Sequence, residues 1–377
     1  MKKKTRSKIR VLVIDDSALI RKLLSSILNS APDIEVVATA PDPIIAREKI
    51  KKLNPDVLTL DIEMPKMDGI SFLTNLMRLR PMPVVMVSTL TEKGADITLQ
   101  ALELGAIDFI SKPKIDIADG INKYSEEIVE KVRIAANANV RGTISSTIVV
   151  HKKYTADAIL KSGATRKHFK TTDKVIAIGA STGGTEAIKK ILSSLPPYCP
   201  GIVIAQHMPE TFTKSFAERM DRFSQMTVCE ATNGEQIIAG RVYIAPGNQH
   251  LIVEKSGARY ICKLSSGLPV NRHRPSVDVL FRSVSQNVGP NSIGILLTGM
   301  GNDGANGLKE MHDAGAKTII QDENTSVVWG MPKEAFKLGA ADNIEPIYAI
   351  SECLQKLLNK MDVSKRDLNG NDIPQNM

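Results

Sequence analysis

Residues 175–188 read VIAIGASTGGTEAI, an apolar run that leads through a glycine-rich turn into a stretch with helical spacing. A buried strand, a tight turn and an amphipathic helix in this order form the basic unit of a parallel α/β sheet. The turn itself allows three interpretations: a phosphate-binding loop, a dinucleotide-binding loop, or a sharp turn that presents Ser181 for chemistry. The residues on either side of Ser181 distinguish these interpretations.

The glycine-rich turn fits the third interpretation best. A phosphate-binding P-loop ends in Gly-Lys-Ser/Thr, but here Gly184 is followed by Thr185 and Glu186. A dinucleotide-binding loop needs a glycine where Ser181 stands, because only glycine lets a pyrophosphate approach the backbone there. The letters do satisfy Gly-x-Ser-x-Gly between a strand and a helix, as a nucleophile elbow requires. The turn therefore favours a nucleophilic serine, with a plain helix N-cap as the alternative.

The same alternation of apolar runs and amphipathic stretches extends over most of the chain. From residue 10 to about residue 133 it predicts about five strands and five helices, and it resumes after residue 173. Residues 137–172, between these parts, are rich in Ser, Thr and Lys and lack sustained periodicity, which is typical of a linker. The sequence therefore predicts two α/β domains with mostly parallel sheets. One antiparallel pair is expected in residues 241–254, RVYIAPGNQHLIVE, which resemble a hairpin closed by Pro246, Gly247 and Asn248.

Length and composition agree with this division. A chain of 377 residues exceeds one ordinary core, and 42% hydrophobic with 24% charged residues is typical of a soluble globular protein. No apolar run reaches the roughly 18 to 20 residues of a membrane helix, and no signal-peptide core follows the basic start. We therefore expect a cytoplasmic protein without membrane insertion. The four cysteines have neither metal-ligand nor disulfide spacing, and we expect them to be structural thiols.

The net charge of +8 does not indicate nucleic-acid binding, because of where the charge lies. Residues 1–10 contain six basic and no acidic side chains, and residues 137–174 contain eight basic and two acidic ones. These two segments together carry +12, which leaves −4 for the rest of the chain. The positive charge is thus concentrated on a tail and a linker, and no nucleic-acid partner is expected.

Polar side chains follow successive strands of the first predicted domain. Asp15 and Asp16 follow VLVI, Asp61 follows VLTL, Ser88 ends VVMVS, and Lys112 follows FIS. The carboxyl ends of parallel strands meet at one edge of a sheet, where three carboxylates would repel one another unless a cation such as Mg²⁺ joined them. Such a metal and a lysine ammonium would hold an incoming phosphoryl group, with Ser88 as a further donor. Helix capping is the alternative for any one acid, but it does not account for the whole set.

Two further polar residues follow strands of the second predicted domain. A serine hydroxyl is a poor nucleophile without a base, and His207, like Ser181, leaves a strand at its carboxyl end. Asp303 follows the strand IGILLT in a glycine-rich loop. Ser181, His207 and Asp303 therefore predict a catalytic triad. The chain order Ser, His, Asp differs from the order Ser, Asp, His of the α/β-hydrolases, so that fold is not expected.

Residues 10 to 133 resemble the receiver domain of two-component response regulators. The resemblance lies in VIDDS (13–17), LDIEMPKMDG (60–69), VMVST (85–89) and AIDFISKP (106–113). It implies phosphorylation of Asp61 by a phosphohistidine on a histidine kinase, with Mg²⁺ as the cofactor. By position it also implies that Asp16 binds Mg²⁺ directly, that Asp15 binds it through water, and that the backbone carbonyl of Glu63 is a further ligand. Lys112 would bind the phosphoryl group, Ser88 would be the switch hydroxyl, and Phe109 would be the aromatic rotamer switch.

Residues 173 to about 355 resemble the chemotaxis-specific protein-glutamate methylesterases, the CheB family. The resemblance lies in IGASTGGTEAI (178–188), AQHMP (205–209), residues 274–281, LLTGMGNDGANGL (296–308) and VVWGMP (327–332). It implies hydrolysis of γ-glutamyl methyl esters, and deamidation of specific glutamines, on methyl-accepting chemotaxis receptors during adaptation, with no cofactor for the ester chemistry. Ser181 would attack the ester, His207 would move its proton, and Asp303 would orient the imidazole. The backbone N–H of Met300 would bind the oxyanion, with assistance from Thr182.

A receiver joined to a methylesterase domain is the architecture of that family, and it completes the expected fold. We expect two doubly wound α/β domains: a flavodoxin-like (βα)5 receiver over 9–133, a basic linker over 134–172, a methylesterase domain over 173–360 and a disordered tail over 361–377. The unphosphorylated receiver is expected to inhibit the esterase. A DNA-binding regulator would need a helix-turn-helix, which the alternating second half does not offer. A pseudoenzyme that only accepts phosphoryl groups is disfavoured, because all three triad positions are filled.

Overall fold

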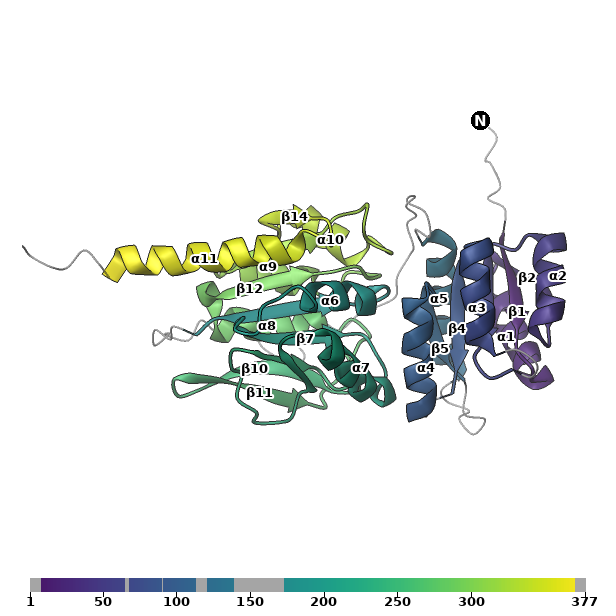
Figure 1. Ribbon diagram of the computed structural model, residues 1–377, viewed down its shortest axis with the longest axis horizontal. Coiled ribbons are helices and arrows are strands. Elements are labelled where there is room, and N and C mark those ends of the chain that lie inside the picture. Colours follow the sequence, from purple (N-terminus) through teal and green to yellow (C-terminus); the bar gives the residue numbers. More distant parts are fainter. Residues whose placement is uncertain (1–7, 65–67, 90, 113–120, 139–172, 370–377) are drawn as a thin grey trace, which may run out of the picture. The chain divides into compact units, whose positions relative to one another are not determined.

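The computed structural model describes residues 8–64, 68–89, 91–112, 121–138 and 173–369. The chain divides between residues 149 and 150 into two compact units, each with its own parallel sheet covered by helices (Figure 1). This agrees with the expected fold class of two doubly wound α/β domains. The four domain limits stay predictions, and most of the expected linker, from residue 139 onward, lies outside the described residues.

The first unit is built on a five-stranded parallel sheet in the order β2-β1-β3-β4-β5. The central strands VLTLD and VVMVS are buried along their whole length, because helices cover both faces of a parallel sheet. β1 pairs with β3, not only with β2, so the strand order reverses at β1 and leaves a crevice at the carboxyl ends of these strands. The strands are β1 (Ile9–Ile14), β2 (Ile34–Ala40), β3 (Val57–Asp61), β4 (Val84–Ser88) and β5 (Asp108–Ser111).

Four helices of the first unit begin at a residue that caps them. Ser17, Asp42, Asp68 and Thr91 each accept a hydrogen bond from a first-turn backbone N–H of α1 to α4, respectively. Because Ser17 caps α1, Asp16 is not the cap, and its carboxylate lies with Asp15 and Asp61 at the edge of the sheet. The helices are α1 (Ala18–Ser30), α2 (Pro43–Leu53), α3 (Gly69–Leu79), α4 (Glu92–Glu103) and α5 (Ile121–Asn137).

The second unit is built on a seven-stranded sheet in the order β14-β13-β12-β6-β7-β9-β8, with all of these pairs parallel. β6 is buried along its whole length and lies between β12 and β7, so the carboxyl ends of these three strands meet at one edge. The strands are β6 (Val175–Ala180), β7 (Gly201–Gln206), β8 (Thr227–Glu230), β9 (Arg241–Ile244), β12 (Ser292–Leu296), β13 (Lys317–Gln321) and β14 (Asn343–Glu345).

Helices cover this sheet, and α8 packs closely on both α9 and a separate hairpin, β10-β11. Phe281 of α8 is fully buried in the core beneath the sheet. Within the described residues, none of the helices combines the length and the apolar character that crossing a membrane would require. The helices are α6 (Gly184–Leu192), α7 (Glu210–Phe223), α8 (Val277–Asn287), the short 3₁₀ helix η2 (Gly289–Asn291), α9 (Ala305–Asp313), α10 (Met331–Lys337) and α11 (Ile350–Asn369).

The predicted hairpin over residues 241–254 is wrong. β9 pairs in parallel with β7 and β8, while β10 (His250–Ser256) pairs antiparallel with β11 (Arg259–Ser265). Gly257, between β10 and β11, has a φ of 61°, in the left-handed region that favours glycine and that tight hairpin turns require. The antiparallel pair therefore exists, but it forms one strand later than expected, and residues 246–248 link the sheet to the hairpin.

Two helices extend beyond the domain limits expected from the sequence. α5 continues to Asn137, past the expected receiver limit at residue 133, and α11 continues to Asn369, past the expected catalytic limit at residue 360. The first part of the expected disordered tail is thus helical. Both extensions contain residues of good helix propensity, alanine in the first and methionine, lysine, arginine and leucine in the second.

Candidate functional site

Ser181 lies directly after β6, in the turn that leads into α6. The helix begins at Gly184, and its N-cap is Gly183 with a φ of 78° and no side-chain cap. Ser181 contributes to the turn through its backbone carbonyl, which accepts a hydrogen bond from the Gly184 N–H at 2.7 Å. The interpretation of Ser181 as a plain helix cap is therefore wrong, and its hydroxyl is directed elsewhere.

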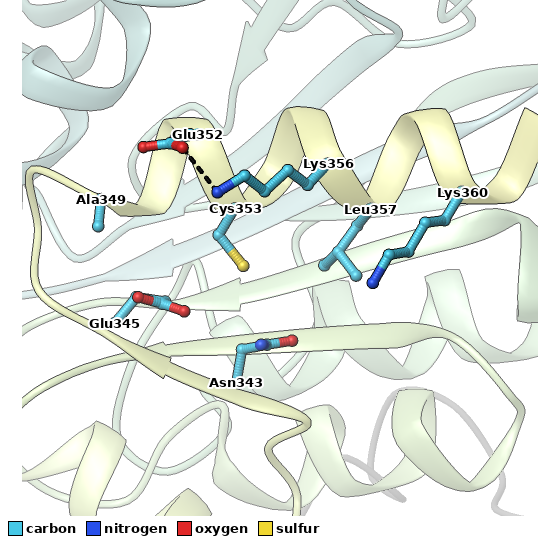
Figure 2. Close-up of a pocket in the computed structure, with 8 residues that line it drawn as sticks. All are labelled: Asn343, Glu345, Ala349, Glu352, Cys353, Lys356, Leu357 and Lys360. Carbon is cyan, nitrogen blue, oxygen red and sulfur yellow. Dashed lines mark ion pairs between the residues drawn. The ribbon is translucent and has the colours of Figure 1, made fainter.

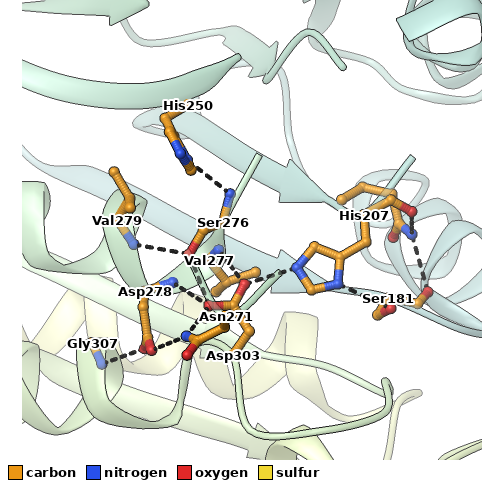
Figure 3. A network of polar contacts seen from close by, with 11 residues as sticks. Ser181, His207, His250, Asn271, Ser276, Val277, Asp278, Val279, Asp303 and Gly307 are labelled. Carbon is orange, nitrogen blue, oxygen red and sulfur yellow. Dashed lines mark hydrogen bonds and ion pairs between the residues drawn. The ribbon is translucent and has the colours of Figure 1, made fainter. Parts of the chain in front are cut away.

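The hydroxyl of Ser181 faces the imidazole of His207 (Figure 3). Nδ1 of His207 lies 3.1 Å from Ser181 Oγ, and Nε2 lies 2.8 Å from Oδ2 of Asp303. Because a carboxylate only accepts, the ring proton belongs on Nε2, and Nδ1 is left as the acceptor for the serine hydroxyl. Gln206 supports both residues, since its Nε2 donates to the backbone carbonyls of Ser181 at 3.0 Å and His207 at 3.2 Å. The structure thus brings all three predicted triad residues together.

Asp303 is 1% exposed, and it is surrounded by hydrogen-bond donors. Oδ1 accepts from Asn271 Nδ2 at 2.8 Å and from Ser276 Oγ at 2.8 Å, and Oδ2 accepts from the Val277 N–H at 2.7 Å (Figure 3). Burial alone would raise the pKa of Asp303, but the hydrogen bond from His207 and the other donors hold that pKa below its usual value. Asp303 is therefore ionised and fixed opposite His207.

A second buried carboxylate, Asp278, lies beside Asp303. Asn271 Nδ2 donates to Asp278 Oδ2 at 2.7 Å as well as to Asp303, and the Gly307 N–H donates to Asp278 Oδ1 at 2.7 Å. Burial, and then the charge of Asp303, raise the pKa of Asp278 to about 7. Asp303, in the loop before α9, thus binds the amino end of α8, and Asp278, in the first turn of α8, binds the amino end of α9.

A second histidine, His273, lies against the site. Its ring stacks on the His207 ring, with 3.6 Å between centroids and 9° between planes. The sequence did not single out His273, Asn271 or Asp278, although Asp278 lies within the PSVDVLF segment. All three belong to the irregular segment before α8 or to its first turn, where no strand end indicates convergence.

The loop after β12 passes close to Ser181. A Cβ atom added to Gly299 would lie 2.7 Å from the Cβ of Ser181, so only glycine allows this approach. Thr298 joins the two segments, because its carbonyl accepts from the Ser181 N–H at 3.1 Å and its Oγ1 donates to the Thr182 carbonyl at 3.0 Å. Met300 follows in this loop and is partly buried. Its oxyanion role and the assisting role of Thr182 stay predictions.

The first unit gathers its acids as the sequence predicts. Asp15, Asp16 and Asp61 offer oxygen atoms that all lie within 4.8 Å of one another. Lys112 Nζ lies 2.8 Å from Asp61 Oδ2 and 3.4 Å from Asp15 Oδ2. Burial raises the pKa of Asp61, the hydrogen bond from Lys112 opposes this, and the charge of Asp15 raises the pKa further. The net effect is a pKa of about 6.

These carboxylates fit a divalent cation. Asp15 is fully buried, yet among the described residues its Oδ2 has no hydrogen-bond partner of good geometry. An all-oxygen donor set with such an unsatisfied buried oxygen suits Mg²⁺. The backbone N–H of Glu63 donates to Asp61 Oδ1 at 3.4 Å. The role of the Glu63 carbonyl as a Mg²⁺ ligand stays a prediction.

The expected switch residues lie on β4 and β5, the two strands beyond β3. Ser88 ends β4 and is 1% exposed, and its Oγ accepts a hydrogen bond from Thr98 Oγ1 of α4 at 2.8 Å. Phe109 on β5 is 5% exposed, with Lys131 Nζ 4.9 Å from its ring centroid. A hydroxyl and an aromatic ring thus stand where the sequence places them, and their switching roles stay predictions.

An acidic cluster with a lysine at the edge of one sheet and a Ser-His-Asp constellation at the edge of the other are the sites expected of a response regulator with a hydrolase output domain. The sequence profile of the response regulator receiver domain matches residues 11–122, and that of CheB methylesterase matches residues 176–354. The protein-glutamate methylesterase/protein-glutamine glutaminase 1 of Geobacter metallireducens is 57% identical over 339 residues, which cover 90% of this chain and 93% of that protein. The protein-glutamate methylesterase/protein-glutamine glutaminase of Hydrogenovibrio crunogenus is 54% identical over 94% of this chain and 100% of that protein. The chain belongs to the CheB methylesterase family.

Solved structures are similar to each unit separately. The catalytic domain of CheB methylesterase from Thermotoga maritima is 40% identical and covers 49% of this chain and 98% of its own, with a TM-score of 0.48. The response regulator domain of CheB from the same organism is 48% identical and covers 35% of this chain and 98% of its own, with a TM-score of 0.32.

Proposed function

We propose that this chain is a phosphorylation-activated protein-glutamate methylesterase that acts on methyl-accepting chemotaxis receptors and deamidates specific glutamines on them. The observation that carries the proposal is the contact of His207 with both Ser181 Oγ, at 3.1 Å, and Asp303 Oδ2, at 2.8 Å. This arrangement suits acyl transfer, in which a base activates a serine and an acid orients the base. Family membership supports the choice of a glutamyl ester as the substrate.

The proposed ester cleavage has two steps. Ser181 Oγ attacks the γ-carbonyl carbon while Nδ1 of His207 takes its proton, and the Met300 N–H binds the developing oxyanion. The bond between the carbonyl carbon and the methoxy oxygen then breaks, and His207 gives the proton to that oxygen, which leaves as methanol. In the second step His207 takes a proton from water while the water oxygen attacks the acyl carbon. The bond between that carbon and Ser181 Oγ then breaks, His207 returns the proton to Oγ, and the glutamate side chain is released with Ser181 restored. Deamidation follows the same course with ammonia as the leaving group.

The ester chemistry proposed here needs no metal, because each charge that develops has a partner on the chain. Asp303 stays ionised beside the imidazolium, since hydrogen bonds hold its pKa below the usual value. The oxyanion faces a loop whose glycines let the backbone approach the substrate.

Regulation is assigned to the first unit. Asp61 would accept a phosphoryl group from a histidine kinase, with Lys112 binding one of its oxygens and Ser88 another. Asp15, Asp16, Asp61 and the backbone carbonyl of Glu63 would hold Mg²⁺, which when bound neutralises charge on the phosphoryl group. To bind that group, the Ser88 hydroxyl would exchange its 3.3 Å hydrogen bonds to the Thr89 and Gly94 carbonyls for one to a phosphoryl oxygen, which would alter its contact with α4. A cytoplasmic location is part of this proposal, because histidine-kinase partners and receptor signalling segments act there.

The test is methanol release from methylated receptor membranes by the full chain. Ser181→Ala should lower the rate by at least about a thousandfold, because the nucleophile is lost, and His207→Ala should have an effect of similar size. Ser193→Ala is the matched control, since Ser193 is exposed after α6 and should leave the rate unchanged. A Ser181→Ala protein that still released methanol would overturn the catalytic assignment. A DNA-binding regulator or a simple phosphoryl acceptor would release none in any form.

A further inference from the structure

The face of the His207 ring is covered by a second imidazole. His273 lies parallel to it, with 3.6 Å between ring centroids and 9° between ring planes. This separation is van der Waals contact over the whole ring face. The side chain of His207 is only 8% exposed, so its base function depends on the groups packed around it.

The backbone fixes where His273 lies. The Val270 and His273 backbones exchange two hydrogen bonds, at 3.1 Å and 2.8 Å, and so close a tight turn. The two residues inside the turn, Asn271 and Arg272, have φ values of 51° and 73°, in the region that side chains with a Cβ rarely adopt. Val270 is fully buried and anchors the turn in the core. A turn held in a disfavoured conformation by buried contacts places its side chains reproducibly.

The same turn also holds the other end of the His207 hydrogen-bond chain. Asn271 Nδ2 donates to Asp303 Oδ1 at 2.8 Å, while Asp303 Oδ2 accepts from His207 Nε2 at 2.8 Å (Figure 3). Two residues of one turn, His273 and Asn271, therefore contact the imidazole face and the carboxylate that orients it. This double contact distinguishes His273 from a histidine that only fills space beside the site.

We propose that His273 is a positioning residue for the proton transfer between Ser181 and His207. A histidine ring rotates about a broad torsion, and its two hydrogen bonds fix the direction of the nitrogens better than the tilt of the plane. The stacked ring limits that tilt, so that Nδ1 stays directed at Ser181 Oγ while Nε2 stays directed at Asp303. The face of the ring, and not a proton of His273, does this. The inference rests on the proposed role of His207 as the base for Ser181.

The first experiment measures serine reactivity without the receptor. A fluorophosphonate labels an activated serine: the Oγ–P bond forms, the P–F bond breaks, the serine proton passes to the base, and fluoride leaves. In the full chain, His273→Ala should slow labelling of Ser181 about fivefold to tenfold, which is the range expected for loss of a stacked aromatic pair. His273→Phe keeps a flat ring without nitrogens and should label within about twofold of the unaltered chain.

Controls separate this effect from general damage. Ser181→Ala should not be labelled, and His312→Ala, on an exposed part of α9, should label at the unaltered rate. A plain structural role for His273 would lower the melting temperature of both His273 variants alike, whereas the positioning role predicts rescue by phenylalanine. In methanol release, His273→Ala should lower kcat while KM changes less than about twofold, because the ring acts on the base and not on substrate binding.

The two proposals fail differently. Unaltered labelling of His273→Ala, or equally slow labelling of His273→Ala and His273→Phe, overturns the positioning role while leaving the methylesterase proposal intact. Absence of methanol release by the unaltered chain, together with labelling that slows in His273→Ala and recovers in His273→Phe, supports the positioning role and removes only the proposed substrate. Equal labelling of His207→Ala and the unaltered chain overturns the base role and the inference with it.

Discussion

The buried carboxylates of Asp278 and Asp303 both accept a hydrogen bond from the side-chain amide of Asn271. Burial raises the pKa of each acid, but the hydrogen bond from His207 brings Asp303 below its usual value, while the neighbouring charge of Asp303 keeps Asp278 above it, at about 7. The two environments thus drive the pKa values apart, and the negative charge concentrates on the acid that faces the base. The hydrogen bond from Asn271 also lowers the pKa of Asp303, so Asn271 helps to keep that carboxylate ionised.

This arrangement predicts a pH-dependent stability effect of Asp278→Asn. A carboxyl whose folded pKa is about 7 and whose unfolded pKa is near 4 binds more protons in the folded state, so its contribution to stability falls as pH rises from 4 to 7. The stability of the Asp278→Asn variant does not decrease in this way, because asparagine does not titrate. Relative to the unaltered chain it should gain about 3 kcal/mol in free energy of unfolding between pH 5 and pH 8.

Denaturant unfolding followed by the fluorescence of Trp329 measures this difference, because Trp329 is the only tryptophan of the chain and belongs to the second unit. Stability curves of the two proteins that run parallel from pH 5 to pH 8 would contradict the raised pKa.

At this scale the sequence predicted the convergence of some residues and not of others. Ser181, His207 and Asp303 each follow a strand, and the carboxyl ends of adjacent parallel strands must meet. Asn271 and His273 lie in an irregular segment between β11 and α8, where no periodicity relates sequence position to location. Their contacts with Asp303 and His207 depend on a left-handed turn of non-glycine residues, which sequence patterns do not predict.

Among the elements, the strand after β8 shows why one pairing was predicted wrongly. Residues 241–254 contain two apolar runs around a Pro-Gly-Asn turn, which is a reasonable hairpin signal. β9 pairs instead with β7, and the Ala245 N–H extends this contact to the Ile204 carbonyl at 2.8 Å. A parallel neighbour distant in sequence cannot be recognised from local turn residues. The fold class was predictable because the alternation of strands and helices is local, whereas strand partners are not.

The segment before α10 supports the loop that carries Met300. The Gly299 carbonyl accepts hydrogen bonds from the backbone N–H groups of Gly330, at 3.1 Å, and Met331, at 2.8 Å. A Cβ atom on Gly330 would lie 2.7 Å from the Gly299 carbonyl oxygen and 3.1 Å from the Gly301 nitrogen. These are backbone atoms, so the loop itself would have to move.

Gly330→Ala should therefore lower kcat for methanol release about tenfold to a hundredfold, because displacement of an oxyanion donor by a fraction of an ångström weakens transition-state binding. Gly201→Ala is the matched control. Its Cβ would lie 2.6 Å from Ile237 Cγ2, an equally crowded contact at the opposite end of β7 from His207. The control should lose stability but keep its activity per folded molecule, as judged by melting temperature and active-serine labelling. Equal kcat in the two variants would show that the loop tolerates the shift.

At the scale of the whole molecule, the proposed phosphorylation of Asp61 would have to change the activity of Ser181, which belongs to the other unit. Each unit has its own sheet and its own buried core, so the two sites belong to separately packed bodies. In the first unit, the proposed phosphorylation would affect α4 through Ser88, because the buried Ser88 hydroxyl donates to the Gly94 carbonyl of that helix and accepts from Thr98. A change at β4 then alters a helix of the receiver and not the triad itself.

Inhibition by the unphosphorylated receiver predicts a specific pattern of activities. A small-molecule phosphodonor with Mg²⁺ should raise methanol release by the full chain, and Asp61→Asn should abolish this response while leaving the basal rate unchanged, because the triad is intact. Deletion of residues 1–149 should raise the basal rate to at least that of the phosphorylated chain, since the inhibiting unit is gone. A different outcome would show that the phosphorylated receiver stimulates the esterase directly. In that outcome the well-folded deletion protein has a rate no higher than the basal rate, while the full chain still responds to the phosphodonor. The comparison therefore distinguishes relief of inhibition from active stimulation, provided that Trp329 fluorescence and serine labelling establish equal folding of the two proteins.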